Sequence, residues 1–312
     1  MDTKKKAFFT ISAFILVLTI IACSCGSLSP ALGGAPVKTV VVPAGGSPGT
    51  QAPAPATETP AAQPSASSPS VSSGPAALEQ VTAQVDIPAG GKGLGTATCP
   101  EGSLMLGGGF ASGKGIQITR SMPDPTGWLV AGMNTNGEAL SLSVYAVCLK
   151  NAPGSTHIVS VNVPISGAPF ARCEKGEIIT GGGFADDSGS LDVYISTPIG
   201  ESIDPNNAWS VMARSSQNAD QPITVFAVCL AGSGLTSTLA RDEKVNYGPK
   251  GNSLDFSIAC PAGSQMVSGG YEGRGVYSNR LSPTDASVWE MQVQEKDFFD
   301  GSLDHAVCLT LP

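Results

Sequence analysis

The sequence predicts an all-β protein in which three tandem, disulfide-closed small β-modules follow a disordered stalk. Three observations favour this class. Glycine is abundant, with 38 of 312 residues, and no long stretch shows helical periodicity. Short segments such as 141–148 alternate apolar and polar residues with the period of two that is typical of strands. Finally, a comparison of the chain with itself finds one pattern of residues three times.

The N-terminus has the features of an export signal. Lys4, Lys5 and Lys6 precede an apolar stretch of 16 residues, 7–22. A membrane-spanning helix needs about 20 apolar residues, so this stretch is short for one. We interpret residues 1–22 as a signal peptide, and an ordinary cleaved signal or an uncleaved anchor helix are the alternatives to a lipoprotein signal.

The run Ile20-Ile21-Ala22-Cys23 resembles the lipobox of bacterial lipoproteins. In that family the cysteine becomes the first mature residue and carries the lipid, so the resemblance implies that Cys23 is the lipid attachment site. Cys25 fits less well, because Ala22 would then stand where the lipobox has Leu, Ile or Val. The implied location is the cell envelope, with the chain exported, facing outward and held to the membrane by its N-terminal lipid.

Residues 23–77 differ in composition from the rest of the chain. They consist almost entirely of Pro, Ala, Ser, Thr, Gly and Val, and only Lys38 and Glu58 are charged. Such a segment buries too little apolar surface to offset its chain entropy, so we predict a disordered linker. The string G-x-S-x-G at 45–49 lies inside it, without the strand and helix that a hydrolase nucleophile needs on either side.

The repeat places modules at residues 78–152, 153–233 and 234–312, each with about six short strands. Every copy has a Cys-x-x-Gly start, a glycine triplet before an aromatic residue, a tryptophan and an Ala-Val-Cys-Leu end. The triplet begins 8 residues after the first cysteine in each copy, with Ser268 as its first residue in the third. Ser-x-Pro at 121–123 and 196–198 corresponds to Ser282-Pro283 in this alignment. The glycines are expected to permit a bulge or a close backbone approach.

Pairing within each repeat closes the same loop three times. It predicts disulfides Cys99–Cys148, Cys173–Cys229 and Cys260–Cys308, which persist in an oxidising compartment. The tryptophans lie 20, 20 and 19 residues before the second cysteine of their module. This nearly fixed spacing favours a core residue packed on the disulfide, with a sugar-stacking platform as the alternative for Trp128, Trp209 and Trp289.

Two architectures are compatible with these modules, a β-sandwich-like unit and a threefold β-prism-like assembly. The Cys-Pro-x-Gly start and the closing cysteine resemble the repeats of vitelline membrane outer layer protein, which implies the prism. Immunoglobulin domains share the Cys–Trp–Cys order, but their tryptophan follows the first cysteine closely, whereas here it follows after 29 to 36 residues. Residues 80–312 also resemble Cys-Pro-x-Gly…Gly-Gly-Gly…Tyr-Ala-Val-Cys units of secreted bacterial proteins, a resemblance that implies no function.

Residues suited to catalysis are few, so we expect no enzyme, no catalytic residue and no cofactor. The chain has two histidines. His157 is predicted to be solvated on a strand, and His305 to take the outer-face position of Tyr145. Asp304 falls on the inward face, either at a strand edge that reaches water or as part of a site. A hydrolase that uses only carboxylates is the least favoured alternative.

No metal site is expected, because the loop 186–192 has carboxylates without the spacing of an EF-hand, and zinc ligands are too few. A net charge of −8 without a basic run argues against nucleic acid. The segments that differ between the copies carry Lys114, Asp186, Asp187 and Arg274, our candidate binding residues. A constant frame with variable loops predicts a surface-anchored, multivalent binding or adhesion protein for polysaccharide or a cell-surface protein. A structural envelope component without a discrete ligand is the alternative.

Overall fold

The computed structural model describes residues 74–151, 154–167, 169–199, 207–217, 219–232, 234–244, 253–294 and 302–311. The predicted signal peptide, Cys23, Cys25 and the linker as far as residue 73 lie outside the described residues. Within these ranges the chain is β-structure apart from turns and one short 3-10 helix, η1 (Ile165–Gly167). None of the described segments is a helix long and apolar enough to span a membrane.

The described strands form three antiparallel sheets of six strands each. The first sheet runs in the order β1 (Ala77–Ile87), β6 (Leu140–Lys150), β3 (Leu104–Ser112), β16 (Val276–Leu281), β17 (Val288–Gln294) and β14 (Ser253–Ala259). The second runs β2 (Lys92–Thr98), β5 (Gly127–Asn134), β4 (Ile116–Asp124), β9 (Ile178–Ala185), β12 (Pro222–Ala231) and β7 (Ser155–Pro164). The third runs β13 (Thr236–Lys244), β18 (Ser302–Thr310), β15 (Gln265–Glu272), β10 (Leu191–Ile199), β11 (Ala208–Ser215) and β8 (Phe170–Arg172). The all-β prediction is confirmed.

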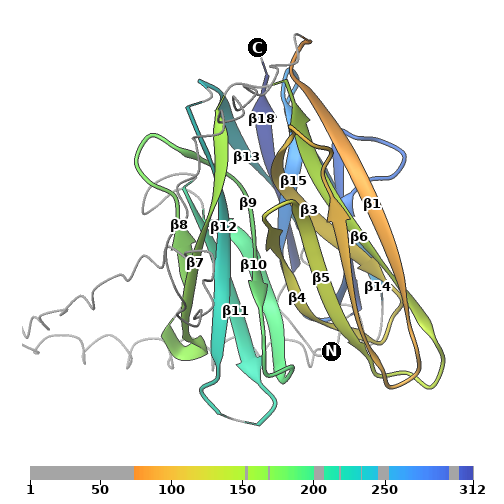
Figure 1. Ribbon diagram of the computed structural model, residues 1–312. Helices are drawn as coiled ribbons and strands as arrows, with labels where there is room; N and C mark the ends of the chain where they lie inside the picture. Colours follow the sequence, from red (N-terminus) through yellow and green to blue (C-terminus); the bar gives the residue numbers. More distant parts are fainter. Residues whose placement is uncertain are drawn as a thin grey trace, which may run out of the picture. The chain divides into compact units, whose positions relative to one another are not determined.

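Every sheet joins strands of two repeats (Figure 1). Repeat one supplies β1 to β6, repeat two β7 to β12 and repeat three β13 to β18. The first sheet combines strands of repeats one and three, the second those of one and two, and the third those of two and three. The three repeats therefore close a cycle, as in the prism-like alternative, and they belong to one compact unit, Ser67–Pro312.

The junction between repeats is narrow in every sheet. Strand β3 pairs with β16, β4 with β9, and β10 with β15, each through two residue pairs. The third glycine of each triplet lies at this crossing. A Cβ on Gly109, Gly183 or Gly270 would stand 2.0, 1.9 or 2.5 Å from a backbone oxygen of the neighbouring repeat. Only glycine therefore allows the two strands to approach this closely.

The second glycine of each triplet makes room for the tryptophan of its own module. A Cβ on Gly108, Gly182 or Gly269 would lie 2.3 to 2.4 Å from the ring of Trp128, Trp209 or Trp289. All three rings are buried, and this confirms the core prediction. Their Nε1–H groups donate to Ser121 Oγ, Ser196 Oγ and Asn279 Oδ1 at 3.1, 3.0 and 2.7 Å. The structural counterpart of Ser121 in repeat three is thus Asn279, and the alignment of Ser282 with it was wrong.

The first residue of each triplet faces the other repeats. A Cβ on Gly107 would lie 2.5 Å from the Cβ of Ser268, and one on Gly181 would lie 2.6 Å from the carbonyl oxygen of Leu106. Thr180, one residue earlier, donates its hydroxyl to that same oxygen at 2.8 Å. Strands β3, β9 and β15 consequently contact one another. The predicted roles of the triplets, close approach and bulging, are confirmed, since the register of β3 and of β15 shifts beside the triplet.

The three predicted disulfides are all present. They link residues 49, 56 and 48 positions apart, and each joins the residue directly after the second strand of a repeat to its last strand. Closing a loop of that length in the unfolded chain is worth about 4 kcal/mol in the chain-entropy model. The bonds therefore stabilise repeats whose separate cores would be small.

We expect Gly183→Ala to lower the free energy of unfolding by about 1–3 kcal/mol, because its Cβ would overlap the backbone of Ser121 in another repeat. Gly137→Ala is the matched control, since a Cβ there meets nothing within 4 Å. Urea unfolding of both variants and the wild type measures the difference. Equal effects of the two substitutions would contradict the proposed close approach.

Candidate functional site

The loops that differ between the repeats are each bonded to the next repeat, so that their hydrogen bonds form a closed cycle. We call the segments 112–115, 186–190 and 272–275 the tips, and they follow β3, β9 and β15. Each tip is hydrogen-bonded to a carbonyl oxygen of the neighbouring repeat. The three bonds are Asp186 N to Thr119 O (2.8 Å), Gly273 N to Tyr194 O (2.7 Å) and Ser112 Oγ to Tyr277 O (3.1 Å).

The acceptors of these bonds are equivalent residues. Thr119, Tyr194 and Tyr277 each fall at a register shift, between the paired residues of β4 and β5, β10 and β11, or β16 and β17. A bulged residue is unpaired in its own ladder, so its carbonyl group is available to a neighbour. The bulges therefore hold the three tips in place.

A pocket of about 190 Å³, which we call the tip pocket, lies beside the tips of repeats one and three and is lined by all three repeats. Its lining residues are Lys114, Gly115, Ile116, Gln117, Ile118 and Thr135 of repeat one, Leu191, Asp192 and Val193 of repeat two, and Tyr271, Gly275, Val276, Tyr277 and Gln294 of repeat three. Aliphatic side chains alternate with amide, hydroxyl and charged groups in this lining. Such a mixture is typical of a small-ligand site, in which a few polar groups orient the ligand.

Asp192 is the centre of the charged part of the lining. Its Oδ2 accepts from Arg274 Nη2 at 3.0 Å and from Arg214 Nε at 3.3 Å. The Arg274 side chain is 9% exposed, so this ion pair between repeats two and three is well shielded from water. Gln117 Nε2 donates to the carbonyl oxygen of Leu191 at 3.0 Å, and this hydrogen bond links repeat one to repeat two within the lining.

Tyr271 is a pocket residue that the sequence reasoning missed. It occupies the position of Phe110 and Phe184, the aromatic residues that follow the other two glycine triplets. Burial, together with the nearby Asp192 carboxylate, raises the pKa of its phenol well above the usual value. The hydroxyl therefore stays protonated and can donate a hydrogen bond. The tyrosine in place of phenylalanine was the available signal in the sequence.

The four predicted binding residues fall into different environments. Lys114 lines the pocket directly. Arg274 lies beside it through its ion pair with Asp192. Asp186 and Asp187 instead border a second hollow of about 290 Å³, next to Leu94 and other residues of β2, β4 and β5. The structure therefore brings together Lys114 and Arg274, and it separates them from the two aspartates.

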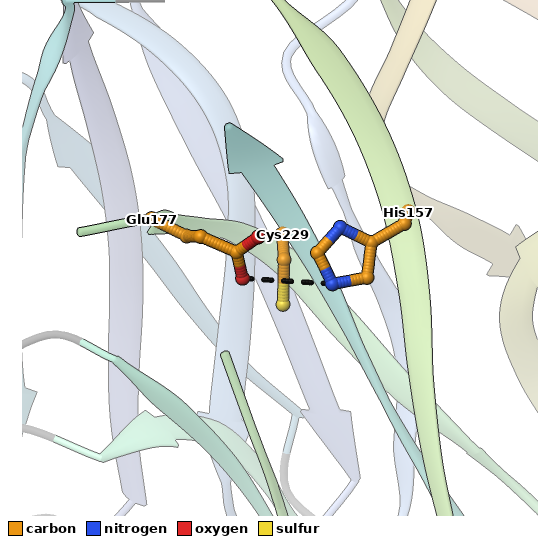
Figure 2. A group of neighbouring side chains, drawn as sticks. All are labelled: His157, Glu177 and Cys229. Atoms are coloured by element: carbon orange, nitrogen blue, oxygen red, sulfur yellow. Dashed lines mark ion pairs between the residues drawn. The ribbon is translucent and has the colours of Figure 1, made fainter. Parts of the chain in front are cut away.

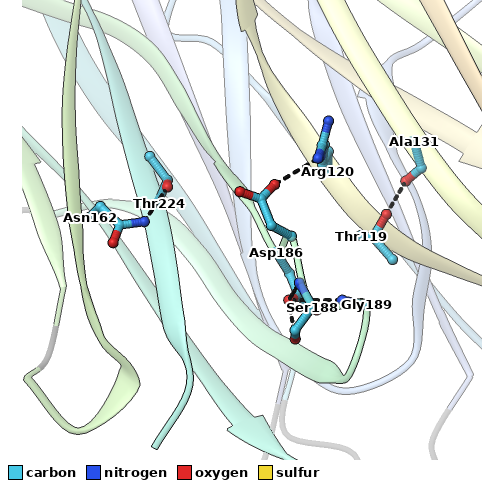
Figure 3. Close-up of polar contacts among 9 residues, drawn as sticks. Thr119, Arg120, Ala131, Asn162, Asp186, Ser188, Gly189 and Thr224 are labelled. Atoms are coloured by element: carbon cyan, nitrogen blue, oxygen red, sulfur yellow. Dashed lines mark hydrogen bonds and ion pairs between the residues drawn. The ribbon is translucent and has the colours of Figure 1, made fainter.

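The adjacent Asp186 and Asp187 have different roles, and Figure 3 shows Asp186 beside Ser188 and Gly189 of its own loop. Asp186 is 2% exposed, and its carboxylate accepts from the backbone N–H groups of Ser188, Gly189 and Leu191 at 2.8 to 3.0 Å. It thus organises its own loop. The Asp187 side chain is 75% exposed and pairs with Arg120 Nη2 at 2.6 Å, across the boundary between repeats two and one.

One group of side chains outside the tips resembles a metal site in composition (Figure 2). His157 Nε2 lies 3.5 Å from Glu177 Oε2, and Cys229 Sγ is close to both. The sulfur is bonded to Cys173, so it is not a thiolate and cannot serve as a ligand. The His157 side chain is 44% exposed, and the pair is a surface ion pair over a disulfide.

His305 and Asp304 are both buried, and this corrects two expectations. His305 was placed on an outer face, but it is 2% exposed, and its Nε2 lies 3.1 Å from Glu272 Oε1. Asp304 was expected at an edge that reaches water. Its strand β18 instead lies between β13 and β15, and the residue is fully buried.

No protein-family model matches this chain, and a search of curated proteins finds none that is significantly similar to it. The interpretation of the pocket therefore depends on its own geometry.

We expect Asp186→Ala to lower the free energy of unfolding by about 1–3 kcal/mol, because buried N–H groups of the loop lose their acceptor. Asp187→Ala should cost less than about 1 kcal/mol, since exposed ion pairs contribute little. Chemical denaturation of the two variants tests the contrast. A larger loss for Asp187→Ala would show that their roles are misassigned.

Proposed function

We propose that this chain is a binding protein of the bacterial cell surface that recognises polysaccharide through the tip pocket. The observation that carries the proposal is a single pocket to which every repeat contributes different polar side chains. A fold that serves only as a structural component does not require different polar side chains from three repeats to line one pocket.

The lining suits a sugar unit. It offers amide groups from Gln117 and Gln294 and hydroxyls from Tyr271 and Tyr277, beside aliphatic side chains. Sugars present hydroxyl groups around an apolar ring face, so they match such a mixture of donors, acceptors and aromatic surface. A pocket of about 190 Å³ has room for one small unit of a longer chain.

The charged groups of the lining favour binding over hydrolysis. Among the described residues that line the pocket, Asp192 is the single carboxylate, and two guanidinium groups engage it. Glycoside hydrolysis generally uses a pair of carboxyl groups with different protonation states. The pocket chemistry is therefore that of recognition.

The proposed location combines the sequence with the disulfides. Lipid attachment at Cys23, following a signal peptide at 1–22, would hold the chain on the envelope and facing outward. Three disulfides in one small protein are in keeping with an oxidising compartment. The multivalency expected from three repeats takes another form in this proposal, since the three repeats share one pocket.

We expect the purified full chain to bind at least one cell-wall or capsular polysaccharide, and Tyr277→Thr to weaken that binding about tenfold. The substitution removes an aromatic pocket residue, and it installs the residue found at the equivalent position of repeat one, Thr119. A tenfold change corresponds to about 1.4 kcal/mol, which is within the range of one lost aromatic contact. Titration by calorimetry or biolayer interferometry gives the affinities.

Tyr194→Thr is the matched control, because Tyr194 is the equivalent residue of repeat two and does not line the pocket. Its affinity should stay within about twofold of the wild type. If the folded chain with intact disulfides binds no polysaccharide, the proposal is wrong, and a structural envelope component becomes the better interpretation. If the two variants weaken binding equally, the tip pocket is not the site.

A further inference from the structure

Lys114 differs from the other cations of the tip region in its partners. Its Nζ donates to Ser253 Oγ and lies 5.5 Å from the centre of the Tyr277 ring, and both partners are neutral. Arg120 pairs with Asp187, and Arg274 pairs with Asp192. Among the residues that the structure describes, no carboxylate pairs with Lys114.

The nearest acidic group of the lining does not compensate for this charge. Asp192 Oδ2 already accepts from Arg274 and Arg214 at 3.0 and 3.3 Å. The Lys114 ammonium group thus brings a positive charge into the pocket of a protein whose net charge is −8. An ammonium group held over a tyrosine ring is positioned rather than freely mobile, which favours a binding role.

Lys114 lines the pocket beside residues of repeat three. The tip that carries Lys114 contacts repeat three, through Ser253 and Tyr277. Gly275 of repeat three is equivalent to Gln117 and Asp192, because each of them lies two residues before the bulged residue of its strand. The carbonyl oxygen of Gly275 accepts a hydrogen bond from the backbone N–H of Gln294. Glycine has no side chain, so Gly275 adds no charge to the lining that it shares with Lys114.

We propose that the tip pocket selects an anionic sugar unit, one that bears a carboxylate or a phosphate, and that Lys114 contacts the anionic group. The inference rests on the proposed function, because it names the ligand class of the same pocket. The Tyr271 hydroxyl supplies a hydrogen-bond donor in the same lining. Lysine binds carboxylates and phosphates as a compact point charge and does not require a fixed geometry.

The test compares three polymers as probes: polygalacturonate for the carboxylate, poly(glycerol phosphate) for the phosphate, and a neutral β-glucan. The full chain should bind one of the acidic polymers at least tenfold more tightly than the glucan, and added salt should weaken that binding. Lys114→Gln should lose about tenfold in affinity for the acidic polymer, with no change for the glucan. Whichever acidic polymer is bound identifies the anionic group.

Lys175→Gln is the matched control. It removes the same charge from the exposed turn that begins at Cys173, at the opposite end of β9 from the tip. Equal losses for Lys114→Gln and Lys175→Gln would show non-specific attraction of polyanions and would overturn the inference. A second outcome would overturn the inference but leave the proposed function intact. In that outcome the chain binds the glucan and the acidic polymers with equal affinity, and Tyr277→Thr weakens the binding whereas Lys114→Gln does not. If the chain binds none of the three polymers and no other polysaccharide, both the inference and the proposed function are wrong.

Discussion

The close approach of backbones at the third glycine of each triplet is the constraint on which the rest of the structure depends. At Gly183 a strand of repeat one crosses so near that its Ser121 carbonyl oxygen would lie 1.9 Å from any added Cβ. Gly109 and Gly270 make the same crossing possible at the other two junctions. Because two residue pairs are enough to continue each sheet into the next repeat, six-stranded sheets form from repeats that supply three strands to each. The cycle closes, and each tip that follows a triplet is bonded to the next repeat.

The closed frame separates positions that must stay alike from positions free to differ. Each tryptophan needs a glycine beneath its ring and a polar acceptor for its indole N–H, and Asn279 meets that requirement in repeat three as serine does elsewhere. The residues that line the pocket share no such requirement. There the equivalent positions carry Gln117, Asp192 and Gly275, so the pocket has no threefold symmetry although the frame approximates it. Chemical asymmetry of this kind is what a single ligand pocket needs.

The sequence predicts whatever depends on spacing within one repeat. The disulfide Cys99–Cys148 and the burial of Trp128 follow from a spacing that recurs three times and from strand periodicity. The sharing of sheets could not be predicted in the same way, because two residue pairs at each junction leave no periodic pattern. Neighbours such as Asp186 and Asp187 look alike in sequence, yet one accepts from its own loop and the other faces another repeat. Their difference arises from how the repeats pack.

The shared pocket also changes what repetition means for binding. Independent modules on one chain would increase avidity, because the first contact raises the effective concentration of the next site. Here the repeats together form one pocket, so a single chain has one copy of the proposed site. Multivalent attachment to a polysaccharide would then require several chains anchored on one surface, each engaging a different sugar unit. Repetition in this protein therefore builds a site from three unlike sides rather than multiplying it.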